Sequence, residues 1–125
     1  MISNLRTTLA LAAVAALAVP AAVVATALPA SAAASCGKTA SNLDSRSGST
    51  VRMTAGTSAN MRSGSSTSCA IKGWADNQDT LDYYCYTWAT STSSWTYLKN
   101  VTDGTYGWVS DSLLPNNGST VHCGF

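Results

Sequence analysis

Four cysteines and one histidine are the residues of this chain with the most reactive side chains. The cysteines are Cys36, Cys69, Cys85 and Cys123, and the histidine is His122. A tetrahedral metal site needs clustered thiolates and imidazoles, but no two cysteines stand in Cys-x-x-Cys spacing and one histidine adds a single ligand. An even number of cysteines in a short chain instead indicates two disulfides, the pattern of small exported domains. We therefore predict no metal, no cofactor and no thiol nucleophile.

Carboxylates are the second group of side chains that could support catalysis. Asp76, Asp79, Asp103 and Asp111 supply the residue type that glycoside hydrolysis uses in pairs. All four lie in predicted turns or at strand ends, where aspartate commonly bonds to nearby backbone N–H groups. The chain has no Gly-x-Ser-x-Gly elbow, no His-Glu-x-x-His motif and no phosphate-binding glycine loop. The protein is therefore not predicted to be an enzyme, and a small hydrolase is the most distant alternative.

The cysteines sit on or near segments that predict β-structure. Residues 69–74 and 80–88 are two candidate strands around a polar turn centred on Asn77. If they fold as a hairpin, Cys69 and Cys85 lie opposite each other, close enough for a disulfide. Of the three possible connectivities, this one leaves Cys36 to pair with Cys123, which would tie the two ends of the chain together. Small domains need such links because their cores are thin.

Alternation along residues 80–88 sorts the side chains onto two faces of a strand. Leu81, Tyr83, Cys85 and Thr87 share the face that the disulfide draws toward the core. The other face carries Asp82, Tyr84, Tyr86 and Trp88. The next predicted strand, 95–99, adds Trp95 and Tyr97, and its Leu98 is expected to point inward. The candidate ligand-binding residues are therefore Tyr84, Tyr86, Trp88, Trp95 and Tyr97, with Trp108 as an alternative. The competing interpretation is that a loop or the N-terminal arm covers these rings.

The first 34 residues have the pattern of a secretory signal peptide. A weakly positive start is followed by an apolar run, Leu9 to Leu28, and then by small residues that form an Ala-x-Ala cleavage site. Cleavage is expected between Ala32 and Ser35. A retained membrane anchor is the alternative, because the run approaches the length of a membrane span, but Pro20 would interrupt its helix. The sequence therefore predicts a secreted protein, with association to the cell wall as a further possibility.

The chain that remains after cleavage has balanced charge. From residue 35 onward six Lys and Arg residues face six Asp residues, and the sequence contains no Glu. Binding to nucleic acid requires clustered positive charge, and binding to anionic lipid requires a basic segment. We therefore expect a neutral surface rich in Ser and Thr, with neither nucleic acid nor membrane as a partner.

Two short motifs indicate the domain organisation. Asn60-Met61-Arg62-Ser63-Gly64 and Gly107-Trp108-Val109 resemble the first and last strands of bacterial SH3-like domains. The resemblance covers roughly residues 57–115 and implies a small barrel of five or more short antiparallel strands. Cysteines and extra aromatics replace the aliphatic residues that the family's middle strands usually carry. We expect an arm at 35–56, the SH3-like domain at 57–115, and a tail at 116–125 tied by Cys123.

The resemblance also implies a function. SH3-like domains of this type are mostly non-catalytic modules that hold peptidoglycan or its peptides. We predict a secreted binding module, acting as a monomer, whose ligand is a cell-wall peptide or glycan. The alternative is a secreted protein-interaction or inhibitory factor that uses the same aromatic face. Asn60 and Arg62 are expected to tie the first loop to the barrel rather than to contact a ligand.

Overall fold

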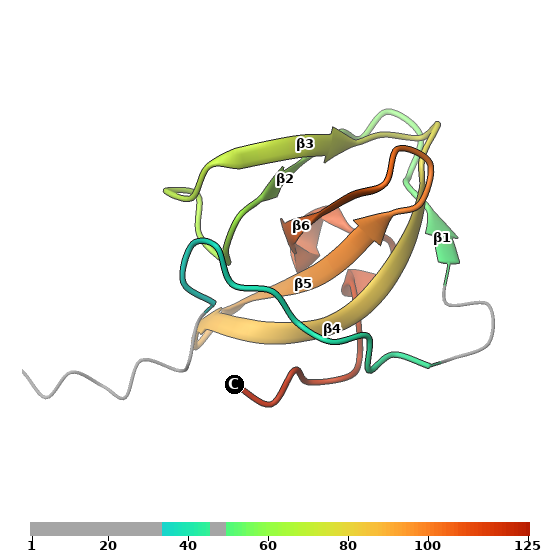
Figure 1. Cartoon of the computed structure of the whole chain (residues 1–125). Helices are drawn as coiled ribbons and strands as arrows, with labels where there is room; N and C mark the ends of the chain where they lie inside the picture. The colour runs from blue at the N-terminus through green and yellow to red at the C-terminus, as the bar shows by residue number, and fades with distance from the viewer. Residues whose placement is uncertain (1–33, 46–49) are drawn as a thin grey trace, which may run out of the picture.

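In the computed structural model, which describes residues 34–45 and 50–125, the chain forms one antiparallel sheet (Figure 1). The strands are β1 (Thr50–Arg52), β2 (Ala59–Arg62), β3 (Ile71–Ala75), β4 (Thr80–Thr90), β5 (Ser93–Asn100) and β6 (Thr105–Ser110). Two short 3-10 turns follow, η1 (Asp111–Leu113) and η2 (Pro115–Asn117). The predicted all-β fold of short antiparallel strands is confirmed.

The predicted signal peptide lies outside the described residues, apart from its final position, Ala34. Within residues 34–45 and 50–125, no helix is long and apolar enough to cross a membrane.

The six strands follow the order β1-β4-β5-β6-β2-β3 in the sheet. The sheet curls so that β2 and β3 lie across from β4 and β5, as Figure 1 shows. The space between them holds the main core, which includes Met61, Leu81, Tyr83, Leu98 and Val109. Leu98 points inward as predicted and is fully buried. Gly107 lets β6 approach β2 closely, because an added Cβ would lie 3.1 Å from the carbonyl oxygen of Arg62.

The segment from β3 to β4 forms a corner, and the predicted hairpin is wrong. The polar turn does form, since the Asp79 N–H donates to the Asp76 carbonyl oxygen at 3.0 Å. Beyond the turn, however, β3 pairs with β2, while β4 pairs with β1 and β5. A corner of this kind lets Ala75 and Leu81 enter the same core from different strands. Counting residues from the turn cannot distinguish it from a hairpin, because both use the same polar turn.

The disulfides join Cys36 to Cys69 and Cys85 to Cys123, with Cα atoms 5.3 and 4.9 Å apart. All four cysteines are therefore paired, but the predicted partners, Cys69 with Cys85 and Cys36 with Cys123, are wrong. The error follows from the corner. Because β3 and β4 pair with different strands rather than with each other, Cys69 and Cys85 do not lie opposite each other. Each actual disulfide instead fastens a segment that lies outside the six strands, residues 34–45 of the arm in one case and the C-terminal tail in the other.

The arm and the tail also supply backbone partners to β4. Tyr84 accepts hydrogen bonds through its carbonyl from the N–H groups of Leu43 and Asp44, at 3.0 and 2.9 Å. Tyr86 donates to the Val121 carbonyl and accepts from the Cys123 N–H, both at 2.8 Å. These bonds occupy strand positions that β1 does not reach. An open strand edge would otherwise offer unpaired groups to a second chain.

Replacing both cysteines of either pair by serine should lower the free energy of unfolding by about 2–5 kcal/mol, because each link restricts the unfolded chain. Denaturant titration of the two double variants measures this loss. Peptide mapping of the unreduced protein should recover Cys36 linked to Cys69 and Cys85 linked to Cys123. Recovery of a Cys69–Cys85 peptide would show that β3 and β4 do form a hairpin.

Candidate binding site

Three of the predicted ligand-binding aromatics are buried. Trp95, Tyr97 and Trp108 form a second apolar cluster, on the opposite face of the sheet from the main core. The rings of Tyr97 and Trp108 are in contact, with centroids 5.1 Å apart. These residues do not form the exposed platform that the sequence predicted, and the alternative interpretation, coverage by the arm, describes them correctly.

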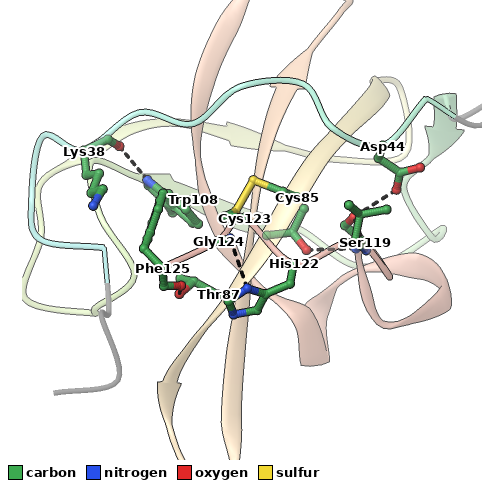
Figure 2. Close-up of a disulfide and its surroundings, with 12 residues drawn as sticks. Lys38, Asp44, Cys85, Thr87, Trp108, Ser119, His122, Cys123, Gly124 and Phe125 are labelled. Atoms are coloured by element: carbon green, nitrogen blue, oxygen red, sulfur yellow. Dashed lines mark hydrogen bonds between the residues drawn. A yellow bond between two sulfur atoms is a disulfide. The ribbon is translucent and has the colours of Figure 1, made fainter. Parts of the chain in front are cut away.

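The arm and the tail both pack against this cluster, through Ala34, Ala40, Cys123 and Phe125. Figure 2 shows Lys38 of the arm and Phe125 of the tail beside Trp108. The indole N–H of Trp108 donates to the Lys38 carbonyl oxygen at 2.7 Å. The Lys38 ammonium lies 3.6 Å from the centre of the Phe125 ring, and Phe125 packs on Trp108 with ring centroids 6.1 Å apart. Both the backbone carbonyl and the side-chain ammonium of Lys38 therefore make contacts within the fold.

A β-bulge divides the predicted row of Tyr84, Tyr86 and Trp88. Tyr83 pairs with Leu98, whereas Cys85 pairs with Tyr97, so Tyr84 is the extra residue. Strand positions after the bulge therefore face the opposite way from the period-2 prediction. Cys85 and Thr87 share the face of the second cluster, although the prediction placed them with Leu81 and Tyr83 in the main core.

The rings on β4 accordingly separate into two groups. Tyr84 packs edge-on against Tyr97 and Tyr106, with centroids 5.6 and 5.9 Å apart. Burial, together with its hydrogen bond to Tyr106, raises the pKa of Tyr84 to about 12. Tyr86 packs instead against Trp88, at 6.1 Å, and against the His122 ring, at 5.3 Å. The predicted continuous platform is therefore absent, and Trp88 is the most exposed of the predicted rings, at 42%.

Trp88 stands beside a hollow of about 430 Å³ whose other walls are polar. A second hollow of about 390 Å³ adjoins it and shares Ser93, Ser110 and Ser112 with it. We call the two together the serine trough. Its remaining lining residues are Ser58, Asn60, Arg62, Thr67, Thr92, Ser94, Trp95, Asp111, Leu113 and Asn117. The trough offers many hydroxyl groups and few charges. Two indole rings line it, of which Trp88 is exposed and Trp95 is buried.

Asp111 is the only carboxylate among the residues that line the trough, and its oxygens are already bonded. The Ser94 hydroxyl donates to Oδ2 at 2.5 Å, and the Thr96 hydroxyl donates to Oδ1 at 2.6 Å. Burial raises the pKa of Asp111, and the two hydroxyl bonds partly oppose that shift. One carboxylate without a second one in the lining does not provide the acid and base pair of a glycosidase.

The hydrogen bonds continue from Asp111 into the tail and the arm. The Ser119 N–H donates to Thr96 Oγ1 at 2.9 Å, and the Ser119 hydroxyl donates to Asp44 Oδ2 at 2.9 Å. Gly118 makes this approach possible, because an added Cβ would clash with Thr96 and Asp111. The wall of the trough is thus continuous with the segments that cover the second cluster.

Arg62 has the structural role that the sequence predicted. Its Nη1 donates to the carbonyl oxygens of Thr67 and Cys69, at 2.9 and 3.1 Å. The guanidinium thereby holds the loop between β2 and β3 beside the trough. In residues 34–45 and 50–125 there is no group of three His, Cys, Asp or Glu side chains that could hold a metal ion.

The serines of the trough were not among the predicted site residues. They lie just before β2, at the start of β5, at the end of β6 and in η1. Antiparallel pairing brings these places together, because Trp95 of β5 pairs with Ser110 of β6, and β2 pairs with β6 on the other side. The sequence offered one usable signal, the Ser110-Asp111-Ser112 run directly after the Gly-Trp-Val motif. This pattern, an acidic residue between two serines at a strand end, is compatible with a polar recess and also with an ordinary turn, so it does not by itself predict a site.

Asp111→Asn should change how stability depends on pH. Because the folded pKa of Asp111 is raised, its protonated form is favoured by folding. The stabilisation that protonated Asp111 gives to the folded state is fully present below the ordinary pKa of aspartate. It is lost as pH rises through the raised pKa of Asp111. The free energy of unfolding of the native protein, relative to that of the variant, should therefore fall as pH rises through the acid range. Thermal melts of both proteins at matched pH values measure this, and a relative stability that increases with pH would contradict it.

Comparison of the chain with protein-family models, with curated protein sequences and with solved structures finds no match. The resemblance to bacterial SH3-like domains therefore depends on the two short motifs described above.

Proposed function

We propose that the protein is an exported, non-catalytic binding module that holds a cell-wall peptide or glycan in the serine trough. The observation that carries this proposal is the exposed indole of Trp88 beside a recess lined by hydroxyl groups. An aromatic ring offers a large apolar contact to a sugar face or a peptide side chain at low entropic cost. The surrounding hydroxyls can donate to and accept from the ligand's polar groups.

Three further observations support the proposal. The two disulfides are typical of an oxidising compartment outside the cytoplasm. The leader pattern favours export. The balanced charge of residues 35–125 suits a ligand that is recognised by rings and hydroxyls rather than by ion pairs.

A second candidate function is binding to another secreted protein. It is favoured by β3, which forms one edge of the sheet and exposes Trp74 and Ile71 by 62% and 53%. An exposed edge strand with large side chains can pair with an extended segment of a partner. Trp74 does not line the trough, so the two candidate functions use different surfaces.

Trp88→Ala should weaken co-sedimentation with insoluble peptidoglycan by about tenfold or more, the loss typical of an interface hot spot. The melting temperature should change little, because the side chain is substantially exposed. Raising the salt concentration should have little effect on binding, since screening acts on charged contacts.

Trp74→Ala is the matched control, since it removes an even more exposed indole outside the trough. It should leave co-sedimentation unchanged. If Trp74→Ala abolishes binding and Trp88→Ala does not, the β3 edge is the binding surface. If the unaltered protein stays in the supernatant, the wall ligand is wrong and a protein partner becomes the better candidate.

A further inference from the structure

Ala34 is built into the fold, although it belongs to the segment whose sequence predicts removal. Its side chain is 3% exposed and packs in the second cluster with Trp95 and Trp108. Its carbonyl oxygen accepts two hydrogen bonds from Ser65, from the N–H at 3.0 Å and from the hydroxyl at 3.2 Å. Ser65 is itself buried, so both of its donors depend on this acceptor.

The residues that follow Ala34 are held close to the loop between β2 and β3, which contains Ser65. Gly64 leaves no room for a side chain, because an added Cβ would lie 2.8 Å from the Cα of Cys36. The Gly37 N–H donates to the Ser63 carbonyl oxygen at 2.6 Å, and Cys36 is bonded to Cys69. The arm is therefore held in place from Ala34 onward. Ala34 lies two residues before Cys36, so the disulfide and the hydrogen bonds to Ser65 hold the same short segment.

The sequence alone allows three cleavage positions, because small residues stand two apart at three overlapping places. A cut after Ala34 would remove the acceptor of both Ser65 donors and a buried methyl group. A cut after Ala33 would place the new ammonium on Ala34, a residue with almost no exposed surface, and burying a charge is costly. A cut after Ala32 keeps Ala34 and places the charge one residue before it.

We propose that the leader is hydrolysed between Ala32 and Ala33, so that Ala34 remains in the exported protein as the anchor of the arm. The reaction is peptide hydrolysis by a signal peptidase of the exporting cell. Water adds as the amide C–N bond breaks, leaving a carboxylate on Ala32 and an ammonium on Ala33. This inference rests on the export included in the proposed function, but it does not depend on what the serine trough binds.

The intact mass of the exported product tests the position of the cut. The full chain is expressed with its own leader in a secreting host, and the protein is recovered from the medium. The first residue should be Ala33. A first residue of Ser35 would overturn the inference that Ala34 is retained, and one of Ala34 would overturn the choice of bond. Finding only uncleaved, cell-associated chain would overturn export itself, which separates that failure from the other two.

A deletion tests whether Ala34 acts as an anchor. Removing Ala33 and Ala34 from the full chain keeps the Ala30-Ser31-Ala32 site and yields an exported protein that begins at Ser35. Its melting temperature should fall by about 4–8 °C or more, the shift expected for losing roughly 1 kcal/mol in a domain of this size.

Ser65→Ala, made in both backgrounds, separates loss of the anchor from general damage to the arm. In the protein that retains Ala34, the substitution should lower the melting temperature, because it removes one bond to the Ala34 carbonyl. In the deletion background it should have little effect, since that bond is already absent. An equal cost in both backgrounds would overturn the anchoring role.

Discussion

The sheet is apolar on both faces, and residues 34–45 and the C-terminal tail cover the second one. The main core fills the inside of the curl. Trp95, Tyr97 and Trp108 point out of the other face, where a sheet of this size has no second layer to receive them. Residues 34–45 and the C-terminal tail provide that layer. Fully burying an aromatic side chain contributes on the order of 1.5–3 kcal/mol, so this layer accounts for a large part of the stability of a small domain.

Neither covering segment could stay in place through apolar contacts alone. The arm is rich in Ser, Thr and Gly and contributes mainly small apolar side chains. It is held by a disulfide, by the indole bond of Trp108 to the Lys38 carbonyl, and by backbone bonds to β4. The tail is held by the second disulfide and by its own bonds to Tyr86. Disulfides and hydrogen bonds thus hold these two segments against the sheet, whereas a helix would be held there by a large apolar face.

The polar network of Asp111, Thr96, Ser119 and Asp44 joins this covering layer to the serine trough. Among the described residues, no fully buried side-chain nitrogen or oxygen lacks a hydrogen-bond partner. A fully bonded network in a low-dielectric interior is rigid, because each member would lose a partner if another moved. The wall of the proposed binding site is therefore positioned by the same contacts that hold the arm and the tail. This arrangement fixes the Asp111 carboxylate and the Ser94 hydroxyl that bonds to it.

The sequence by itself determined the all-β class, the two disulfides, the inward direction of Leu98 and the structural role of Arg62. Composition, residue period and local turn chemistry control these features. Tertiary structure decided the disulfide partners. The polar turn at residues 76–79 can connect two strands either as a hairpin or as a corner, and the sequence of the turn does not distinguish them. Tertiary structure also decided which rings are exposed, because one extra residue at Tyr84 reverses the faces of the residues from Cys85 to Trp88. Period-2 counting assumes an unbroken strand and cannot detect a bulge. The residues of the serine trough were not predicted, because they come from separate segments of the chain, and the tertiary structure decides which strands become neighbours in the sheet.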